Sequence, residues 1–464
     1  MKNKLIRTFL LPLMVLLGLG ALMFLPELEV CGFKLKPVNL LSDVGVDFYD
    51  LEEEEAPILD TIPVVKPPFQ LECPEGVTLI DDYSEQPSDS ACFIGRGMNR
   101  FYELLGKIGR LGRPVRIAYF GDSFIEGDIL TDELRGELQS EYGGSGVGFV
   151  DIASATAGFR QSVRATSKGW SSHCITDSVW FDRSRQGIAE RYYLAKRAAW
   201  VTLNGIPAHQ RLHQDTCAVS QILFRSPEGV TVTARINGGE TQTFDALPSD
   251  EIQALGVRGK IGKVTWSVAD STSTTFYGVT MDGEEGIILD NYSLRGSSGL
   301  TIRTIPDSTL VEFNKVRPYD LVVLQFGLNV AKSNKIHYGD YENRMQRIMK
   351  KLAAAFPEAG FLIVSVSDRG ENRNGEVVTM RGIEQLVSYQ QQLAFHTGTA
   401  FWNMFQAMGG KGSMAQFADT IPALANKDYT HLNFRGGRHL GNLLFKAIKA
   451  GKKNYEKRRE YEAR

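Results

Sequence analysis

The stretch Val115-Arg-Ile-Ala-Tyr-Phe-Gly-Asp-Ser123 decides the fold that this sequence predicts. Its first six residues are mostly apolar, as in a strand that is buried on both faces, and apolar residues recur at helical spacing from Ile129 onward. Ser123 therefore lies in the turn between a strand and the helix that follows it. The same order recurs downstream, with strands predicted at 321–326 and 361–366 and helices at 341–356 and 383–395. Alternating buried strands and helices predict a parallel sheet covered on both faces.

The sequence changes character between about residues 160 and 300. Val230–Ile236 and Val264–Val268 alternate with period two, and Asn237-Gly238 supplies the residues of a tight hairpin turn. This region is therefore predicted to be an all-β insertion. Large aromatic residues contribute strongly to core packing, so we interpret its tryptophans as core residues, with a sugar-stacking surface as the alternative. These tryptophans are Trp170, Trp180, Trp200 and Trp266.

The composition is that of a globular protein large enough for about three domains. The chain has 464 residues, of which 43% are hydrophobic and 23% charged. The 52 basic and 54 acidic side chains leave a formal charge of -2, which provides no overall field to hold a polyanion. We therefore expect no nucleic acid partner and favour a neutral substrate.

The N-terminus carries the pattern of an export signal. Lys2, Lys4 and Arg7 precede an uncharged, largely apolar run from Thr8 to Pro26. Its length is closer to a membrane span than to the core of a cleavable signal, so residues 1–30 are predicted as a signal anchor, with a cleaved signal peptide as the alternative. Basic residues before the span keep that end in the cytoplasm. The rest of the chain is expected on the periplasmic or extracellular face, anchored to the inner membrane by this helix.

A polar linker near the N-terminus and a frayed polar helix at the C-terminus are also predicted. Residues 31–92 are acidic and proline-dotted in large part, which indicates a stalk or linker. Residues 451–464 read as a polar tail after a C-terminal helix at 434–448.

Five cysteines and two closely spaced histidines are the candidates for disulfide bridges and metal ligands. Export permits disulfides, and Cys73 with Cys92 and Cys174 with Cys217 are possible pairs, which leaves Cys31. No C-x-x-C or H-E-x-x-H spacing occurs, so no metal is expected. His209 and His213 are four residues apart but are interpreted as loop histidines.

The chemistry centres on Ser123. A serine hydroxyl becomes a useful nucleophile when a histidine takes its proton and a carboxylate orients that histidine. Asp428-Tyr429-Thr430-His431 offers both groups in one short segment before a helix. An oxyanion also requires hydrogen-bond donors at neighbouring strand ends, and Asn329 follows the strand at 321–326.

At these residues the chain resembles the SGNH (GDSL-type) hydrolases, flavodoxin-like serine esterases with a three-layer α/β sandwich. Gly121-Asp122-Ser123 matches the first family block, Gly327-x-Asn329 the third, and Asp428-x-x-His431 the last. Ser293-Leu294-Arg295-Gly296 resembles the second block, with Gly299 as the alternative glycine. The resemblance implies Ser123 as nucleophile, His431 as base and Asp428 as its orienting carboxylate. It also implies an oxyanion hole made by the Ser123 amide, the Gly296 amide and the Asn329 side chain, and no cofactor.

A narrower resemblance is to the periplasmic peptidoglycan O-acetylesterases. It rests on the stretch from Gly121 to Arg135 and on Tyr142-Gly-Gly-Ser-Gly-Val-Gly-Phe149, a loop that we expect to line the site. In those enzymes a carbohydrate-binding-like β-sandwich is inserted between the first and second blocks. The implied division is a discontinuous hydrolase domain at 93–159 and 297–450 with an inserted, jelly-roll-like domain at 160–296. One departure is Val330, where the family usually has an acidic residue.

Three functions follow as hypotheses. The first is an extracytoplasmic esterase that removes O-acetyl groups from a cell-wall glycan, with acetylated peptidoglycan as the favoured substrate. The second is a glycan O-acetyltransferase that uses the same triad and takes acetyl from a multi-pass acyltransferase in the membrane. The third is a non-catalytic wall-binding protein.

Overall fold

The computed structural model describes residues 69–86, 89–154, 156–177, 181–207 and 213–463, together with two short strands near the N-terminus. These strands, β1 (Leu28–Val30) and β2 (Phe33–Leu35), pair antiparallel in a unit separate from the body that begins at Phe69. The run predicted as a signal anchor, Thr8 to Pro26, lies outside the described residues. Among the helices that are described, none is long and apolar enough to cross a membrane.

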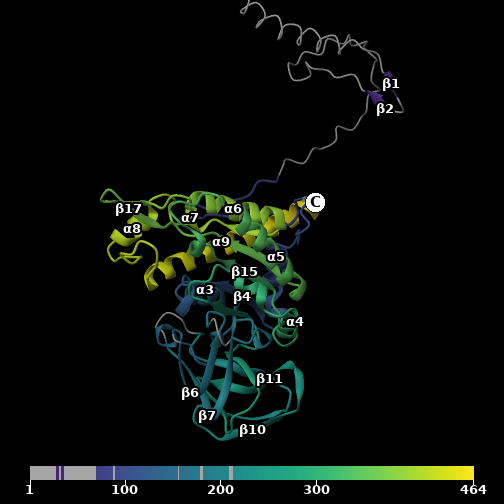
Figure 1. Ribbon diagram of the computed structural model, residues 1–464, viewed down its shortest axis with the longest axis vertical. Helices are drawn as coiled ribbons and strands as arrows, with labels where there is room; N and C mark the ends of the chain where they lie inside the picture. Colours follow the sequence, from purple (N-terminus) through teal and green to yellow (C-terminus); the bar gives the residue numbers. More distant parts are fainter. Residues whose placement is uncertain are drawn as a thin grey trace, which may run out of the picture. The chain divides into compact units, whose positions relative to one another are not determined.

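A six-stranded sheet forms the centre of the body (Figure 1). Its first five strands run parallel and the last is an antiparallel edge. In spatial order they are β14 (Ile287–Ser293), β4 (Val115–Gly121), β15 (Leu321–Gln325), β16 (Gly360–Val364), β19 (Ala400–Trp402) and β3 (Ile80–Asp82). The parallel strands follow the flavodoxin-like order 2-1-3-4-5, in which ligands bind beside the carboxyl end of the first strand. The predicted parallel sheet is therefore confirmed.

Helices cover both faces of this sheet. From β4 the chain crosses to β14 on one side of that strand, and it then returns past β4 to β15, β16 and β19 on the other side. Because crossovers between parallel strands are right-handed, this reversal places the connecting helices on opposite faces of the sheet. One contacting group is α2 (Asn99–Lys107), α3 (Thr131–Tyr142) and α9 (Phe434–Ala463). The other is α4 (Asp307–Val316), α5 (Gly339–Ala355) and α6 (Ile383–Thr397). Two short helices, α7 (Met404–Ala407) and α8 (Ser413–Asp419), precede α9.

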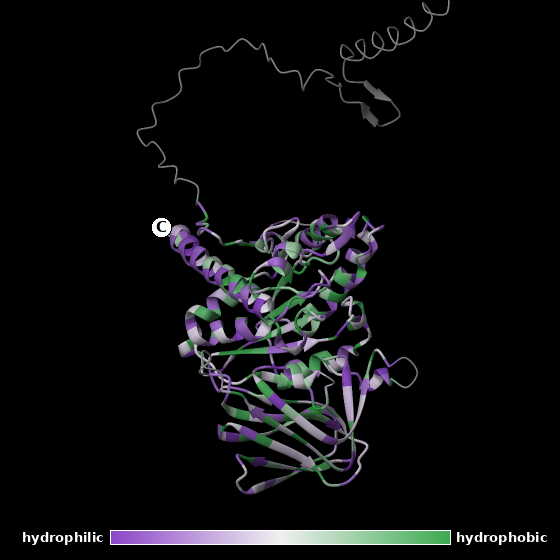
Figure 2. Cartoon of the chain, turned by 90° about the vertical axis from the view of Figure 1, so that its left-hand side faces the viewer, coloured by the Kyte–Doolittle hydropathy of each residue, from purple (hydrophilic) through white to green (hydrophobic). Residues whose placement is uncertain are grey.

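A nine-stranded antiparallel sheet forms the other end of the body (Figures 1 and 2). It has its own core around Trp266, which is fully buried, so core packing is confirmed for that ring. The hairpin turn at Asn237-Gly238 is also confirmed, since both residues have positive φ. The strands are β5 (Gly148–Val150), β6 (Val163–Cys174), β7 (Arg191–Gly205), β8 (Cys217–Ser226), β9 (Val230–Ile236), β10 (Thr241–Ala246), β11 (Ser249–Ile261), β12 (Lys263–Val268) and β13 (Thr275–Met281).

Sheet membership differs from the predicted segments at both ends of the insertion. β14 falls within the segment predicted as inserted, 160–296, but pairs in parallel with β4. β5 falls within the predicted hydrolase segment but pairs with β13. Asp290 interrupts the apolar pattern of β14, and its charge is buried against the Arg317 guanidinium rather than exposed to water. Because such an ion pair places a charged residue inside a buried strand, the hydrophobic pattern alone does not identify that strand as part of the central sheet.

The segments predicted as linker and polar tail pack on each other. Residues 451–463 continue α9, which Figure 2 shows as a largely hydrophilic helix that reaches the C-terminus. Asn454 on this helix is only 5% exposed, accepts a hydrogen bond from the Glu72 amide (2.9 Å) and donates one to its carbonyl (2.8 Å). Arg458 pairs with Glu85 at 3.0 Å. The polar helix predicted for 452–464 is confirmed as the end of α9, but its predicted fraying is wrong because its packing partners are almost 400 positions away in the sequence.

The possible disulfides are not formed among the described residues. Cys73, Cys92, Cys174 and Cys217 are all free thiols. Cys174 ends β6 and Cys217 begins β8, and these strands are not neighbours in the sheet. Cys31 lies outside the described residues.

Candidate active site

Ser123 lies two residues beyond the carboxyl end of β4, as predicted. The turn that presents it is tight: a Cβ on Gly121 would lie 2.9 Å from the Ile125 side chain and 3.1 Å from the Gln325 carbonyl oxygen. The turn is fixed by Asp122, whose Oδ1 accepts a hydrogen bond from the Phe124 amide at 3.0 Å. The local sequence therefore determines where the hydroxyl is placed.

His431 and Asp428 meet Ser123 in the arrangement that the sequence predicted. Nε2 of His431 lies 3.2 Å from Oγ of Ser123, and its Nδ1 lies 2.8 Å from Oδ2 of Asp428. The other carboxylate oxygen, Oδ1, accepts hydrogen bonds from the amides of Thr430 (3.0 Å) and His431 (2.9 Å). One short loop thus orients both the imidazole and the carboxylate. These contacts are within the reach of proton transfer from a serine hydroxyl.

The hydrogen bonds in this loop stabilise the charged form of Asp428. Partial burial acts to raise the pKa of this carboxyl, but the amide and imidazole hydrogen bonds outweigh it and lower the pKa below its ordinary value. Both side chains remain close to half exposed, at 48% for Asp428 and 45% for His431. The carboxylate is therefore ionised at neutral pH, as required to orient an imidazole that gains a proton.

Asn329 faces the same site from the neighbouring strand β15, but its contacts were not foreseen. Its Nδ2 donates hydrogen bonds to Oδ2 of Asp122 and to the carbonyl of Ser297, both at 2.8 Å. Asp122 is 3% exposed, and burial raises its pKa to about 6 despite the hydrogen bonds that it accepts. Asp122 is thus a buried carboxylate that holds Asn329 beside Ser123. The only sequence signal for it is its position inside the Gly-Asp-Ser block.

The backbone amides of Gly296 and Gly299 differ in whether they already donate a hydrogen bond within the described part of the chain. The Gly296 amide has no hydrogen-bond partner within the described part of the chain, and space around its Cα is open. The Gly299 amide instead donates to Oγ of Ser297 at 3.0 Å, and a Cβ there would lie 2.8 Å from the Phe326 ring. The Leu294 amide donates to the Gly121 carbonyl at 3.0 Å, which places the Gly296 turn beside the Ser123 turn. Gly296 is therefore the better donor for a bound oxyanion.

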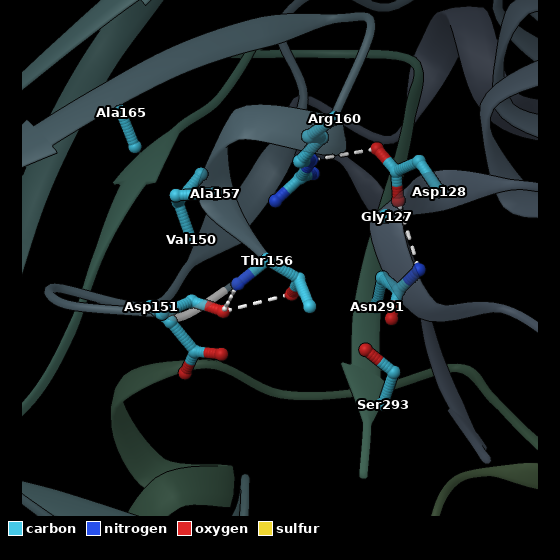
Figure 3. Close-up of a pocket in the computed structure, with 11 residues that line it drawn as sticks. Gly127, Asp128, Val150, Asp151, Thr156, Ala157, Arg160, Ala165, Asn291 and Ser293 are labelled. Atoms are coloured by element: carbon cyan, nitrogen blue, oxygen red, sulfur yellow. Dashed lines mark hydrogen bonds and ion pairs between the residues drawn. The ribbon is translucent and has the colours of Figure 1, made fainter. Parts of the chain in front are cut away.

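A pocket of about 40 Å³ lies between the loop that follows Ser123 and the β-insertion (Figure 3). On one wall Asp128 binds the guanidinium groups of Arg135 (2.9 Å) and Arg160 (2.7 Å) and accepts a hydrogen bond from Asn291 (2.8 Å). Although burial acts to raise the Asp128 pKa, the two arginines lower it far below its ordinary value. The pocket is lined by Gly127, Asp128, Val150, Asp151, Ser154, Thr156, Ala157, Arg160, Ala165, Asn291 and Ser293. This ion-pair network fixes the serine loop to the insertion and was not predicted.

The loop at Gly143–Gly148 does not line the site. A Cβ on Gly144 would lie 2.5 Å from the carbonyl oxygen of Ile287, at the amino end of β14, whereas Ser293 at the other end pairs with Gly121. A Cβ on Gly146 would lie 2.2 Å from the Met281 carbonyl oxygen. These glycines allow close packing of the loop against strands, away from the serine. Within the described ranges, no group of three or more His, Cys, Asp or Glu side chains is arranged to hold a metal ion.

Comparison with known proteins supports the fold assigned here. No protein-family profile and no curated protein matches the sequence. Among solved structures, a peptidoglycan O-acetylesterase is 20% identical with a TM-score of 0.64, and the match covers 81% of this chain and 99% of that chain. This coverage extends beyond the segments that build the parallel sheet. The chain thus shares the fold of this solved structure over most of its length, which supports the fold expected from the resemblance in the sequence.

Two other solved structures match with lower TM-scores. A GDSL-like lipase from Parabacteroides merdae is 13% identical with a TM-score of 0.28, and the match covers 35% of this chain and 74% of that chain. A family two carbohydrate esterase from Cellvibrio japonicus is 9% identical with a TM-score of 0.25, with coverage of 62% and 99%.

Proposed function

We propose that this protein is an extracytoplasmic serine esterase that removes O-acetyl groups from a cell-wall glycan, with peptidoglycan as the first substrate to test. One observation carries the proposal: Ser123, His431 and Asp428 form a continuous hydrogen-bonded chain of 3.2 Å and 2.8 Å. The solved peptidoglycan O-acetylesterase with the same fold supports the choice of substrate. The basic, then apolar N-terminal sequence supports the location.

In the first step Oγ of Ser123 attacks the acetyl carbonyl carbon while Nε2 of His431 accepts the hydroxyl proton. The carbonyl oxygen becomes an oxyanion, for which the amides of Ser123 and Gly296 are the available backbone donors. The bond to the sugar oxygen then breaks, and that oxygen leaves with the proton from His431. The products are a free sugar hydroxyl and an acetyl-serine.

In the second step water attacks the acetyl-serine and His431 accepts a proton from that water. Release of acetate returns the proton to Oγ of Ser123. A sugar hydroxyl in place of water would produce an O-acetyltransferase with the same residues. The two activities differ in the acceptor and in the product, so they are separated by experiment.

The test is acetate release from O-acetylated peptidoglycan by the wild-type chain and by Ser123→Ala. The variant should release no acetate above background because it lacks the nucleophile, and its circular dichroism spectrum should match that of the wild type. Addition of a de-acetylated glycan acceptor and an acetyl ester donor measures transfer in the same assay. Equal acetate release by both proteins, or acetylated glycan as the main product, would contradict the esterase proposal.

A further inference from the structure

A basic cleft opens where the β-insertion meets the α/β part of the body. Its volume is about 690 Å³, which is in the range of ligand-binding sites. The cleft is lined by Ile175, Arg183, Leu300, Thr301, Arg303, Thr304, Arg344, Arg347, Ile348 and Lys351. Five of these ten side chains are cationic at neutral pH and none is acidic. This local charge contrasts with the near-neutral balance of the whole chain.

The arginines of this cleft are available to bind a ligand. Arg183, Arg303, Arg344 and Arg347 are exposed, and within the described ranges none of them forms an ion pair with a carboxylate. Lys351 differs, because its Nζ pairs with Asp307 at 2.8 Å and donates to the Arg303 carbonyl at 3.2 Å. Four like charges that have no carboxylate partner among the described residues repel one another, so an anion that enters the cleft gains attraction from all of them.

The carboxyl behind the cleft does little to neutralise it. Glu190 interacts with Thr301 and is only 5% exposed. Burial raises its pKa to about 7, so the carboxyl is largely protonated in mildly acidic conditions and only partly charged at neutral pH. Glu190 therefore offsets little of the positive charge of the cleft.

The cleft begins next to the candidate oxyanion loop. Leu300 is four residues after Gly296, a separation of at most about 14 Å even for an extended chain. The loop is also tied to the helix that bears the arginines, since Tyr341 on α5 donates a hydrogen bond to the Ser298 carbonyl at 3.0 Å. The candidate oxyanion loop and the cleft are therefore close together in the chain and are joined through α5.

We propose that this cleft binds carboxylates carried by the glycan chain, so that the substrate class is an acidic, not a neutral, acetylated polysaccharide. The inference rests on the proposed esterase function for its site and adds the substrate class. Guanidinium groups match carboxylates in bidentate geometry, and the partly exposed apolar side chains of Ile175 and Leu300 offer surface for the faces of sugar rings. The expectation of a neutral substrate came from net charge, which does not report how charge is distributed.

The experiment measures binding separately from catalysis. Ser123→Ala is titrated with soluble O-acetylated peptidoglycan strands whose carboxylates are intact, and with the same strands after their carboxylates are converted to neutral amides. The intact strands should bind about fivefold to tenfold more tightly at low salt, since each exposed ion pair contributes a modest free energy. The preference should shrink as salt rises. Equal affinity for the two strands would overturn the proposal.

Charge variants in the Ser123→Ala background locate the effect. Arg344→Gln with Arg347→Gln should remove most of the preference for intact strands, and Arg183→Gln with Arg303→Gln should do the same from the other walls. Arg100→Gln with Arg110→Gln removes two exposed charges on and just after α2 and should change affinity less than twofold. Retention of the full preference by both cleft variants would also overturn the proposal.

Acetate release by the wild type from a small neutral acetyl ester is measured in parallel. Charge-selective binding without any acetate release would reject the esterase function and retain the cleft as a carboxylate site. Acetate release without charge-selective binding would reject the cleft as a carboxylate site and retain the esterase function.

Discussion

The two polar clusters beside Ser123 contain one carboxylate each, in opposite environments. Asp428 is half exposed and belongs to the loop of His431, and its hydrogen bonds lower its pKa. Asp122 is 3% exposed and holds Asn329, and burial raises its pKa to about 6. One site therefore contains a carboxylate near solvent whose pKa is lowered and a buried carboxylate whose pKa is raised and which positions an amide.

The largest expected effect comes from the exposed cluster. His431→Gln removes the base, so kcat should fall about a thousandfold or more because the serine hydroxyl keeps its proton. The side chain is 45% exposed, so the midpoint of thermal unfolding should stay within a few degrees of the wild type. Steady-state acetate release and a thermal melt test both statements. A rate within tenfold of the wild type would show that His431 is not the base.

A smaller loss of rate is expected from the buried cluster, together with a loss of stability. Asn329→Ala should lower kcat about a hundredfold, because Asn329 links Asp122 to the Ser297 carbonyl and its loss disturbs the positions of the groups beside Ser123. It also leaves the carboxylate of Asp122 and the carbonyl of Ser297 without their amide partner, which should cost about 1–3 kcal/mol in the free energy of unfolding. Urea denaturation and kinetics on the same preparation measure both. An unchanged rate with reduced stability would assign Asn329 a structural role only.

The pH dependence of stability should differ in sign between the two carboxylates. Asp122 has a raised pKa in the folded state, so between about pH 4 and 6 the folded chain binds more protons and its stability falls as pH rises. The rise in the pKa of Asp122 from 3.8 to about 6 corresponds to at most about 3 kcal/mol in the free energy of unfolding. The free energy of unfolding of the wild type, minus that of Asp122→Asn, should therefore decrease from pH 4 to 6 and then level off.

Asp428→Asn is the matched control and gives the smallest effect. The pKa of Asp428 is lowered in the folded state, so the wild type gains stability relative to this variant as pH rises from below that pKa to the ordinary value of 3.8. The side chain is 48% exposed, and solvent screening keeps the gain small. Urea titrations at several pH values from 3 to 7 compare the two variants. The same sign for both would contradict the assignment of opposite environments.

The candidate triad was predicted from sequence because its geometry is set mostly by local structure. Gly121-Asp122-Ser123 follows a recognisable buried strand, and Asp428 with His431 share one loop whose own hydrogen bonds orient them. The choice of Gly296 over Gly299 remained open in the sequence and required the hydrogen bonds of the two amides. The contact between Asp122 and Asn329 joins the ends of two strands and has no local pattern.

Local sequence patterns predict the order of strands, turns and helices, the hairpins of the insertion and the residues that are able to form a serine-histidine-aspartate chain. Three features emerge only in the folded chain: β14 joins the parallel sheet, the C-terminal residues pack on the segment after residue 69, and arginines from three parts of the chain share one cleft. The reason is physical: periodicity and turn chemistry act between residues close in the chain. A buried ion pair depends instead on segments that meet only after folding. The same holds for a docked helix end and for a cluster of like charges.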